Sequence, residues 1–260
     1  MNPELPVLVE RVGAHVLLVT INRPHKRNAL DVAAATALAA ALRLSEQDAS
    51  VRAVVLTGAG ARCFCAGADL ADIAAGLGEA LTIDGNGLGG LVFAARVKPW
   101  IAAVRGLAVG GGLELALACD MIVAGEDASF ALPEVRRGLL AGAGGAYRAP
   151  RILPRGVALE MLLTGGPLPA ARAHALGMLN HLAPDEEVLA CALDLAARIA
   201  ANAPLAVSAT LAIARAATDE SESELRMRMD AASLALAGSA DAREGVAAFI
   251  EGRAASWIGA

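Results

Sequence analysis

Aromatic residues are scarce in this sequence: Phe, Trp and Tyr make up 3% of its 260 residues, whereas apolar residues make up 56%. The core must therefore be built mainly from Ala, Val, Leu and Ile, and alanine favours helices. The sequence also lacks a basic or aromatic stripe, and its net charge is −5. We therefore expect no nucleic-acid partner, and an anionic ligand would need a local cluster of cations.

Long uncharged apolar runs are also absent. Arg105, Glu114 and Asp120 interrupt the most apolar stretch, residues 101–124, so no segment has the pattern of a membrane-spanning helix. Residues 1–11 contain prolines and glutamates but no basic start followed by an apolar segment, as a secretory signal requires. We expect a cytoplasmic protein that does not enter a membrane.

The cysteines and glycines lack the spacing of known cofactor sites. Cys63 and Cys65 form the one close pair among four cysteines, with no histidine at ligand spacing, so we expect reduced, partly buried thiols and no metal site. Gly110 and Gly112 lack the third glycine of a GxGxxG fingerprint, and no GxxxxGK[ST] loop is present. These absences exclude dinucleotide-fold oxidoreductases and P-loop kinases.

The hydrophobic periodicity predicts a layered α/β fold. Alternation in residues 7–10 and 15–21 predicts a hairpin, and Asp31 is a suitable N-cap for a helix that ends near residue 44. Short apolar runs separated by helical patterns predict buried strands at 53–57, 101–104 and 121–123. Glycine-rich residues 76–90 predict a mobile loop near the ligand.

The last third of the sequence differs from the first two thirds, because its pattern is helical only from about residue 169. We therefore predict a core at residues 1–195 and a C-terminal helical region at 196–260. The amphipathic segments expected to form helices are 185–201, 204–217, 222–237 and 241–253. Such an appendage usually covers the core or a neighbouring subunit.

Two glutamates stand in apolar surroundings. Glu114 follows three glycines and opens an apolar helical run, and Glu134 follows Pro133. A carboxylate in such a setting either is poorly solvated or faces a cavity, and both situations favour a role in proton transfer. The alternative for Glu114 is an ordinary carboxylate favoured by a helix dipole, and for Glu134 a solvated loop residue beside arginines.

Several motifs occur in the order expected for the crotonase (enoyl-CoA hydratase/isomerase) superfamily, which the sequence resembles from about residue 7 to residue 249. They are Asn22-Arg23-Pro24, Asn28-Ala29-Leu30, Cys65-Ala66-Gly67-Ala68-Asp69-Leu70, Lys98-Pro99, Gly110-Gly111-Gly112-Leu113-Glu114, Pro133-Glu134 and Gly142-Ala143-Gly144-Gly145. The resemblance implies a spiral core of ββα turns, a C-terminal helical region for trimerisation, and trimers often paired into hexamers.

The resemblance also implies a catalytic arrangement. The N–H groups of Ala68 and Gly111 match the oxyanion hole that holds the thioester oxygen. Hydratases of the family have glutamates at both positions matching Glu114 and Glu134, whereas double-bond isomerases generally keep only the second. We assign Glu114 mainly to the water and Glu134 mainly to the proton at Cα. We expect the helix N-terminus to keep Glu114 ionised and apolar neighbours to raise the pKa of Glu134.

Coenzyme A is expected as part of the substrate, so no separate cofactor is predicted. By resemblance, its adenine lies along residues 66–70 and its phosphates near a basic cluster, and a residue of a neighbouring subunit completes the site. The binding residues predicted in this way are Arg23, Lys26, Arg27, Ala66, Asp69, Leu70 and Phe249.

The function predicted first is hydration of trans-2-enoyl-CoA to 3-hydroxyacyl-CoA in fatty-acid or related acyl degradation. The alternatives are an enoyl-CoA isomerase, a carnitinyl-CoA-type dehydratase, whose branch resembles residues 151–155, and a catalytically idle acyl-CoA-binding protein. Trp100, Arg105 and Ala141 depart from the usual family pattern. They and the variable segment 71–90 leave the acyl tail open.

Overall fold

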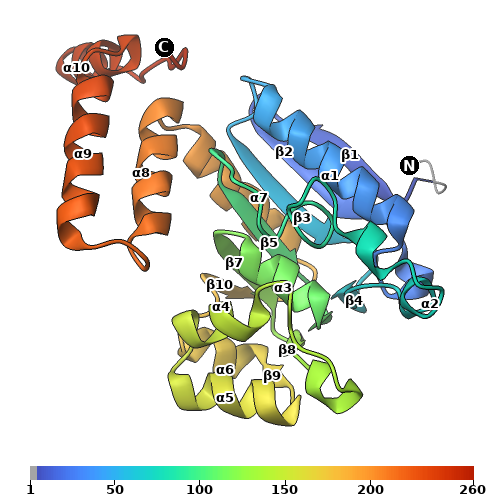
Figure 1. The fold of residues 1–260 in the computed structure, drawn as a ribbon. Helices are drawn as coiled ribbons and strands as arrows, with labels where there is room; N and C mark the ends of the chain where they lie inside the picture. Colours follow the sequence, from blue (N-terminus) through green and yellow to red (C-terminus); the bar gives the residue numbers. More distant parts are fainter. Residues whose placement is uncertain (1–4) are drawn as a thin grey trace.

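Two sheets form the centre of the structure, a computed structural model that describes residues 5–260 (Figure 1). The larger sheet has the order β1-β2-β3-β5-β7-β10, in which only β1 and β2 pair antiparallel. The smaller sheet has the order β4-β6-β8-β9. The strands are β1 (Val7–Val12), β2 (Val16–Ile21), β3 (Ala53–Gly58), β4 (Cys63–Cys65), β5 (Trp100–Val104), β6 (Leu107–Val109), β7 (Met121–Gly125), β8 (Ser129–Ala131), β9 (Leu168–Pro169) and β10 (His181–Ala183).

The chain alternates between the two sheets. β3, β5 and β7 belong to the larger sheet, and each is followed at once by a strand of the smaller sheet, β4, β6 or β8. β4, β6 and β8 pair parallel, as do β3, β5 and β7. A helix follows both β4 and β6, so the polypeptide advances by ββα turns. This confirms the predicted α/β spiral.

Ten α-helices and three short 3-10 helices complete residues 5–260. The α-helices are α1 (Val32–Gln47), α2 (Leu70–Ala74), α3 (Gly111–Ala118), α4 (Gly145–Ile152), α5 (Arg155–Thr164), α6 (Ala170–Ala175), α7 (Val188–Ala200), α8 (Pro204–Ala216), α9 (Glu222–Ala237) and α10 (Ala240–Glu251). The 3-10 helices are η1 (Pro24–Lys26), η2 (Gly78–Leu81) and η3 (Glu134–Arg137).

The predicted hairpin and first helix are confirmed. β1 and β2 pair from Val7 with Ile21 to Val12 with Val16. The side chain of Asp31 caps α1 by accepting a hydrogen bond from the N–H of Ala34 at 2.8 Å. The prediction of helices alone beyond residue 169 is wrong, because β10 pairs with β7. Three residues are too few for periodicity to reveal such a strand.

Strand β3 shows how the larger sheet divides the core into two layers. All six of its residues are buried. Val54 and Leu56 belong to the main core cluster, whereas Ala53 and Val55 face the opposite layer, which α7 covers. This alternation follows from the two-residue period of a strand. Ala192, Ala196 and Ala200 form a stripe with helical spacing, and their small side chains allow α7 to lie close to the sheet.

The C-terminal helices α8–α10 lie apart from the sheets, at one end of the molecule (Figure 1). The predicted boundary between residues 195 and 196 falls inside α7, whose Ala196 and Ala200 are still buried against the sheet. The helical extension therefore begins at Pro204. Within residues 5–260 no single helix is long and apolar enough to cross a bilayer, although α7 and α8, bent by 109°, together meet the criteria of length and composition alone.

Candidate active site

The glycine run Gly110–Gly112 turns the chain from β6 into α3 and brings this helix against β4. Gly110 has φ +58° and ψ −130°, a backbone conformation that other residues rarely adopt. A Cβ on Gly112 would lie 1.9 Å from the carbonyl oxygen of Cys65. Glycine is therefore required at these two positions for the turn and for the close approach of the backbones.

The two backbone N–H groups predicted for the oxyanion hole lie beside one another. A Cβ on Gly111 would be 3.5 Å from the nitrogen of Ala68 and 3.2 Å from Cα of Gly67. Neither the N–H of Ala68 nor that of Gly111 donates a hydrogen bond to any group within residues 5–260. Because Gly111 is the first residue of α3, its N–H has no acceptor in the helix. Two free donors at one place can hold a single oxygen atom that carries negative charge.

Glu114 lies one helical turn after Gly111 and is 3% exposed. Its Oε1 accepts a hydrogen bond of 2.9 Å from the N–H of Gly145, the first residue of α4. Burial raises the pKa of Glu114 to about 7, and the negative charge of Glu134 adds to this rise. Near neutral pH, Glu114 can therefore gain or lose a proton.

Glu134 begins η3, the 3-10 helix that follows β8. Its Oε1 lies 3.1 Å from the position that a Cβ on Gly110 would occupy, so the carboxyl group lies beside the turn that leads into the N–H of Gly111. Its Oε2 is buried and has no hydrogen-bond partner in residues 5–260. Burial raises the pKa of this carboxyl as well. An unpartnered oxygen beside the two N–H donors suits a group that exchanges a proton with a bound ligand.

The predicted difference between the pKa values of Glu114 and Glu134 is therefore wrong. We expected the dipole of α3 to keep Glu114 ionised and only Glu134 to have a raised pKa. Both pKa values are raised, because Glu114 is enclosed by the chain and burial outweighs the stabilisation by the N–H of Gly145. Such a pair can place an acid and a base in one cavity.

Arg23 and Asp69 have structural partners. The guanidinium of Arg23 contacts Asp31 at 2.9 Å and Asp69 at 3.1 Å. Asp69 also accepts a hydrogen bond from the N–H of Ala71 at the start of α2, and these contacts lower its pKa. The charge of Arg23 is thus already compensated, and its main contribution is to hold segment 66–70 in place.

Lys26 and Arg27 retain exposed side chains beside the same segment. The carbonyl oxygen of Arg27 accepts a hydrogen bond of 3.1 Å from the N–H of Ala66, which places the basic loop next to the predicted coenzyme A segment. Leu70 is also exposed. The structure therefore brings Lys26, Arg27, Ala66 and Leu70 together, and they remain candidates for coenzyme A binding.

Phe249 does not lie near the other predicted coenzyme A residues of the same chain. It lies on α10 and is 88% exposed, in the extension that Figure 1 shows at one end of the molecule, away from α3. Its proposed role at an active site requires a second copy of the chain.

Two residues near the glutamates were missed by the sequence analysis. Leu88 lies against Gly111, one of the two predicted oxyanion donors, since a Cβ on Gly111 would be 2.5 Å from its Cδ2. The segment 76–90 that carries Leu88 contains η2 and a bridge between Thr82 and Leu88. Arg148 on α4 is the second, and its positive charge opposes the rise of the Glu114 pKa. Neither residue belongs to a motif that pointed to the site.

The cysteines are structural. All four are free, and Cys63, Cys65 and Cys119 are buried. Burial raises the pKa of Cys63 to about 11 and those of Cys65 and Cys119 to about 12, so these thiols stay protonated and unreactive at neutral pH. Within residues 5–260, no group of three or more His, Cys, Asp or Glu side chains could hold a metal ion.

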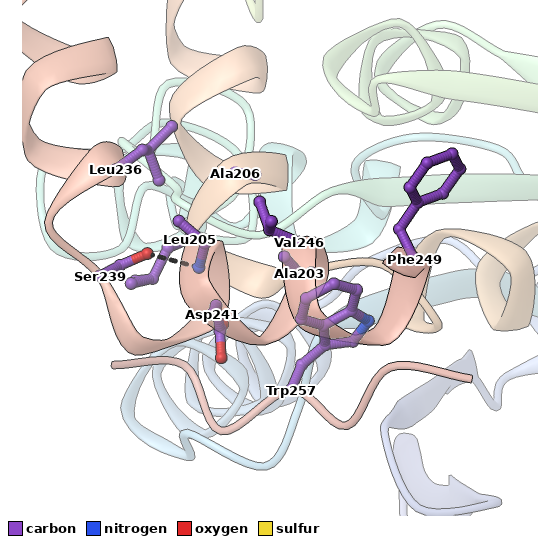
Figure 2. A pocket seen from close by; sticks show the side chains of 11 residues that line it. Ala203, Leu205, Ala206, Leu236, Ser239, Asp241, Val246, Phe249 and Trp257 are labelled. Atoms are coloured by element: carbon purple, nitrogen blue, oxygen red, sulfur yellow. Dashed lines mark hydrogen bonds between the residues drawn. The ribbon is translucent and has the colours of Figure 1, made fainter. Parts of the chain in front are cut away.

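An apolar pocket lies elsewhere, between α8, α10 and the C-terminal segment (Figure 2). Figure 2 shows Leu205, Val246 and Trp257 around it. Its one carboxylate, Asp241, is buried and accepts hydrogen bonds from the N–H groups of Ile258 and Gly259. Because that carboxylate fixes the C-terminal segment, the pocket offers no acid–base pair. The glutamate pair is therefore the stronger candidate for catalysis.

A ββα spiral in which a buried glutamate and a half-buried one lie beside a pair of free N–H groups defines the class of crotonase-fold enzymes. Comparison with known proteins agrees with this class. The family model for enoyl-CoA hydratase/isomerase matches residues 11–260, and the chain belongs to this family, whose members act on acyl-CoA thioesters. It is an enzyme of the hydratase or dehydratase type.

Individual relatives have different reported activities. The chain is 39% identical to a carnitinyl-CoA dehydratase of Proteus mirabilis over 94% of this chain and 95% of the relative. It is 43% identical to the crystal structure of an enoyl-CoA hydratase from Mycobacterium tuberculosis, with a TM-score of 0.94 and coverage of 99% and 100%. A carnitinyl-CoA hydratase structure from Mycobacterium avium is 45% identical, with a TM-score of 0.78 and the same coverage.

Proposed function

We propose that the protein is an enoyl-CoA hydratase, which adds water reversibly across the 2,3 double bond of a trans-2-enoyl-CoA. The observation that carries this proposal is the pair of glutamates, one buried and one half-buried, whose pKa values are raised beside the free N–H groups of Ala68 and Gly111. Hydration needs one group that takes a proton from water and another that gives a proton to carbon. A single carboxylate would serve less well.

In this proposal the thioester oxygen accepts hydrogen bonds from Ala68 and Gly111 as negative charge develops on it. One such donor commonly contributes about 3 kcal/mol to lowering the barrier. Ionised Glu114 takes a proton from a water molecule, whose oxygen forms the bond to Cβ. Protonated Glu134 delivers its proton to Cα. Proton exchange between the two carboxyl groups through solvent then restores the starting state.

The coenzyme A portion would lie along residues 66–70, with its phosphates near Lys26 and Arg27. The exposure of these two cations and the hydrogen bond between Ala66 and Arg27 support this placement. The chain as a whole is acidic, so a local basic loop is needed to attract an anionic ligand.

A second candidate is the dehydration of carnitinyl-CoA, which the similarity to a carnitinyl-CoA dehydratase favours. The same groups would then work in reverse. Glu134 would remove the proton at Cα, and Glu114 would protonate the departing hydroxyl group. The two candidates differ in the acyl tail and not in the acid–base pair.

The decisive experiment follows enoyl thioester absorbance with crotonyl-CoA, with a longer trans-2-enoyl-CoA and with carnitinyl-CoA. Loss of absorbance with the enoyl substrates, abolished in Glu134→Gln, is the expected result. Glu126→Gln is the matched control, because Glu126 is exposed in the turn between β7 and β8. Turnover of carnitinyl-CoA alone would select the second candidate. Binding of coenzyme A esters without turnover of any substrate would indicate an idle binder.

We also propose that the chain associates with itself as a trimer or hexamer. Large apolar side chains are exposed on α9 and α10, namely Met227, Leu234, Val246, Phe249 and Ile250. Exposed apolar groups in one region favour a protein partner. Phe249→Asp should lower the molecular mass measured by light scattering to that of the monomer. An unchanged mass would show that this face is not the contact.

A further inference from the structure

Arg148 joins the segment at Val92 to the turn that contacts Glu114. Its Nη1 donates a hydrogen bond of 3.1 Å to the carbonyl oxygen of Ala143, and its Nη2 donates to that of Val92. The guanidinium carbon is 5.6 Å from the ring centre of Phe93 and 5.2 Å from that of Tyr147. Arg148 is therefore fixed by two carbonyl groups and two aromatic rings.

The turn that Arg148 holds is the one that contacts Glu114. Ala143 is two residues before Gly145, whose N–H donates to the carboxyl of Glu114. Gly144 has φ +106°, and a Cβ at this position would lie 2.1 Å from Nη1 of Arg148. The guanidinium thus occupies the space beside Gly144. Loss of the guanidinium would free the turn and the N–H of Gly145 to move.

Charge gives Arg148 a second connection to Glu114. The hydrogen bonds of Arg148 within residues 5–260 go to carbonyl oxygens and not to carboxylates, so no acid neutralises it by direct contact. Two charged groups act on Glu114, Glu134 from η3 and Arg148 from α4, and they act in opposite directions. A positive charge favours an ionised carboxylate.

We propose that Arg148 is a positioning residue, which holds the turn 143–145 against Glu114 and sets the charge around the carboxyl that exchanges its proton with water. The proposal deepens the proposed hydratase function and rests on it for the role of Glu114. Arg148 itself need not touch the substrate. Its effect reaches the chemistry through the N–H of Gly145 and through its positive charge.

The test compares Arg148→Gln, Arg148→Lys and Arg151→Gln. Arg151 is the matched control, since it lies one turn later on α4, also contacts Tyr147 and does not act on Glu114. The readout is the titration of the Glu114 carboxyl carbon by NMR in substrate-free protein, assigned by its absence in Glu114→Gln. Arg148→Gln should move the midpoint upward by about one pH unit, a tenfold change in the ratio of protonated to ionised carboxyl. Arg148→Lys should move it less, and Arg151→Gln should leave it in place.

Kinetics supply the second readout. With an active hydratase, the acidic limb of kcat/KM should move upward with the NMR midpoint. An unchanged Glu114 midpoint in Arg148→Gln, or an equal shift in Arg151→Gln, would overturn the proposal. If no enoyl-CoA is hydrated, the proposed function fails, but the NMR titration still decides whether Arg148 controls Glu114.

A third measurement tests the turn and does not depend on the glutamine variant. In Arg148→Lys, a single ammonium group replaces the fork that binds both carbonyl oxygens. The amide hydrogen of Gly145 should therefore exchange with solvent at least about tenfold faster than in the wild type, equivalent to about 1.4 kcal/mol of lost protection. Unchanged exchange in a folded Arg148→Lys protein would contradict the positioning role.

Discussion

Helices α3 and α9 are the two extremes of burial that we compare in this molecule. Seven of the eight residues of α3 are buried, whereas none of the sixteen residues of α9 is. A helix that is apolar on all sides can be stable only inside a protein. A carboxylate buried within it lowers stability, so its presence there points to a function. Glu114 therefore lies in the buried part of the molecule, while the residues of α9 stay exposed or half-buried in the single chain.

The two helices also owe their stability to different causes. α3 is held by packing, with Leu113 and Leu115 fully buried in the main core cluster. α9 starts with a capping box, in which Ser221 and Glu224 exchange hydrogen bonds between side chains and backbone. Changes near α3 should therefore affect catalysis and folding, whereas changes in the extension should affect association.

The largest expected effect comes from removing the proposed acid–base pair. Glu114→Gln and Glu134→Gln should each lower kcat by a factor of about 10² to 10⁴, because each removes one proton-transfer group. The kcat of the double variant should be only slightly lower than that of the less active single variant, since the two groups act in one reaction. Steady-state hydration assays measure this, and full additivity of the two losses would contradict a shared role.

Neighbouring glycines should separate catalysis from folding. A methyl group on Gly111 meets the flexible end of Leu88 and lies near the N–H of Ala68, so Gly111→Ala should fold and lose about a hundredfold in kcat/KM. A methyl group on Gly112 meets the carbonyl of Cys65, so Gly112→Ala should destabilise the fold by about 1–3 kcal/mol.

Assays and thermal melts of the two alanine variants measure this contrast. Leu88→Ala combined with Gly111→Ala is the control for crowding by the leucine side chain. If the double variant recovers full activity, the loss arises from the displaced Leu88 and not from obstruction of the oxyanion donors.

The burial of Glu114 should cost stability at high pH. Its pKa is about 7 in the folded chain and 4.5 when solvated, so the folded state binds more protons between these values and stability falls as the pH rises through about 7. Glu114→Gln cannot ionise, so above pH 8 it should be more stable than the wild type by up to about 3 kcal/mol. Below pH 4 the two should be equally stable. Urea unfolding at both pH values measures this, and a gain of equal size at pH 4 would exclude ionisation as its cause.

The smallest effects should come from the exposed cations. Lys26→Ala and Arg27→Ala should raise KM for crotonyl-CoA about threefold each, and the increase should diminish at high salt, because contacts between exposed charges are weak and screened. Arg226→Ala removes an equally exposed cation from α9 and is the matched control. The same rise in KM for this control would indicate a general charge effect and not a binding loop for coenzyme A.

The sequence predicted those elements whose signal is local. The alternation before and after Gly13 and the cap at Asp31 specify the hairpin and α1 without reference to the rest of the chain. β10 was missed because three residues carry no period, and its pairing with β7 depends on contacts about 60 positions away.

The sequence alone named the candidate residues of the site, but it did not reveal their electrostatics. Glu114 and Glu134 stood out as carboxylates in apolar surroundings. The raised pKa of Glu114 depends on burial by segments distant in sequence, among them α4, whose Gly145 and Arg148 lie about 30 residues further along the chain. The partners of Arg23 show the same limit, because Asp69 reaches it only through folding.

In the proposed mechanism, helix α3 supplies both an N–H donor, at Gly111, and a proton-transfer group, at Glu114. Three residues of α-helix correspond to about 4.5 Å along the axis, so the geometry of the helix fixes the spacing between the two groups. Changes intended to alter the acyl preference should therefore leave helix α3 unchanged. Leu88, whose side chain lies near Gly111 but belongs to another segment, can change in size while the spacing along α3 stays constant.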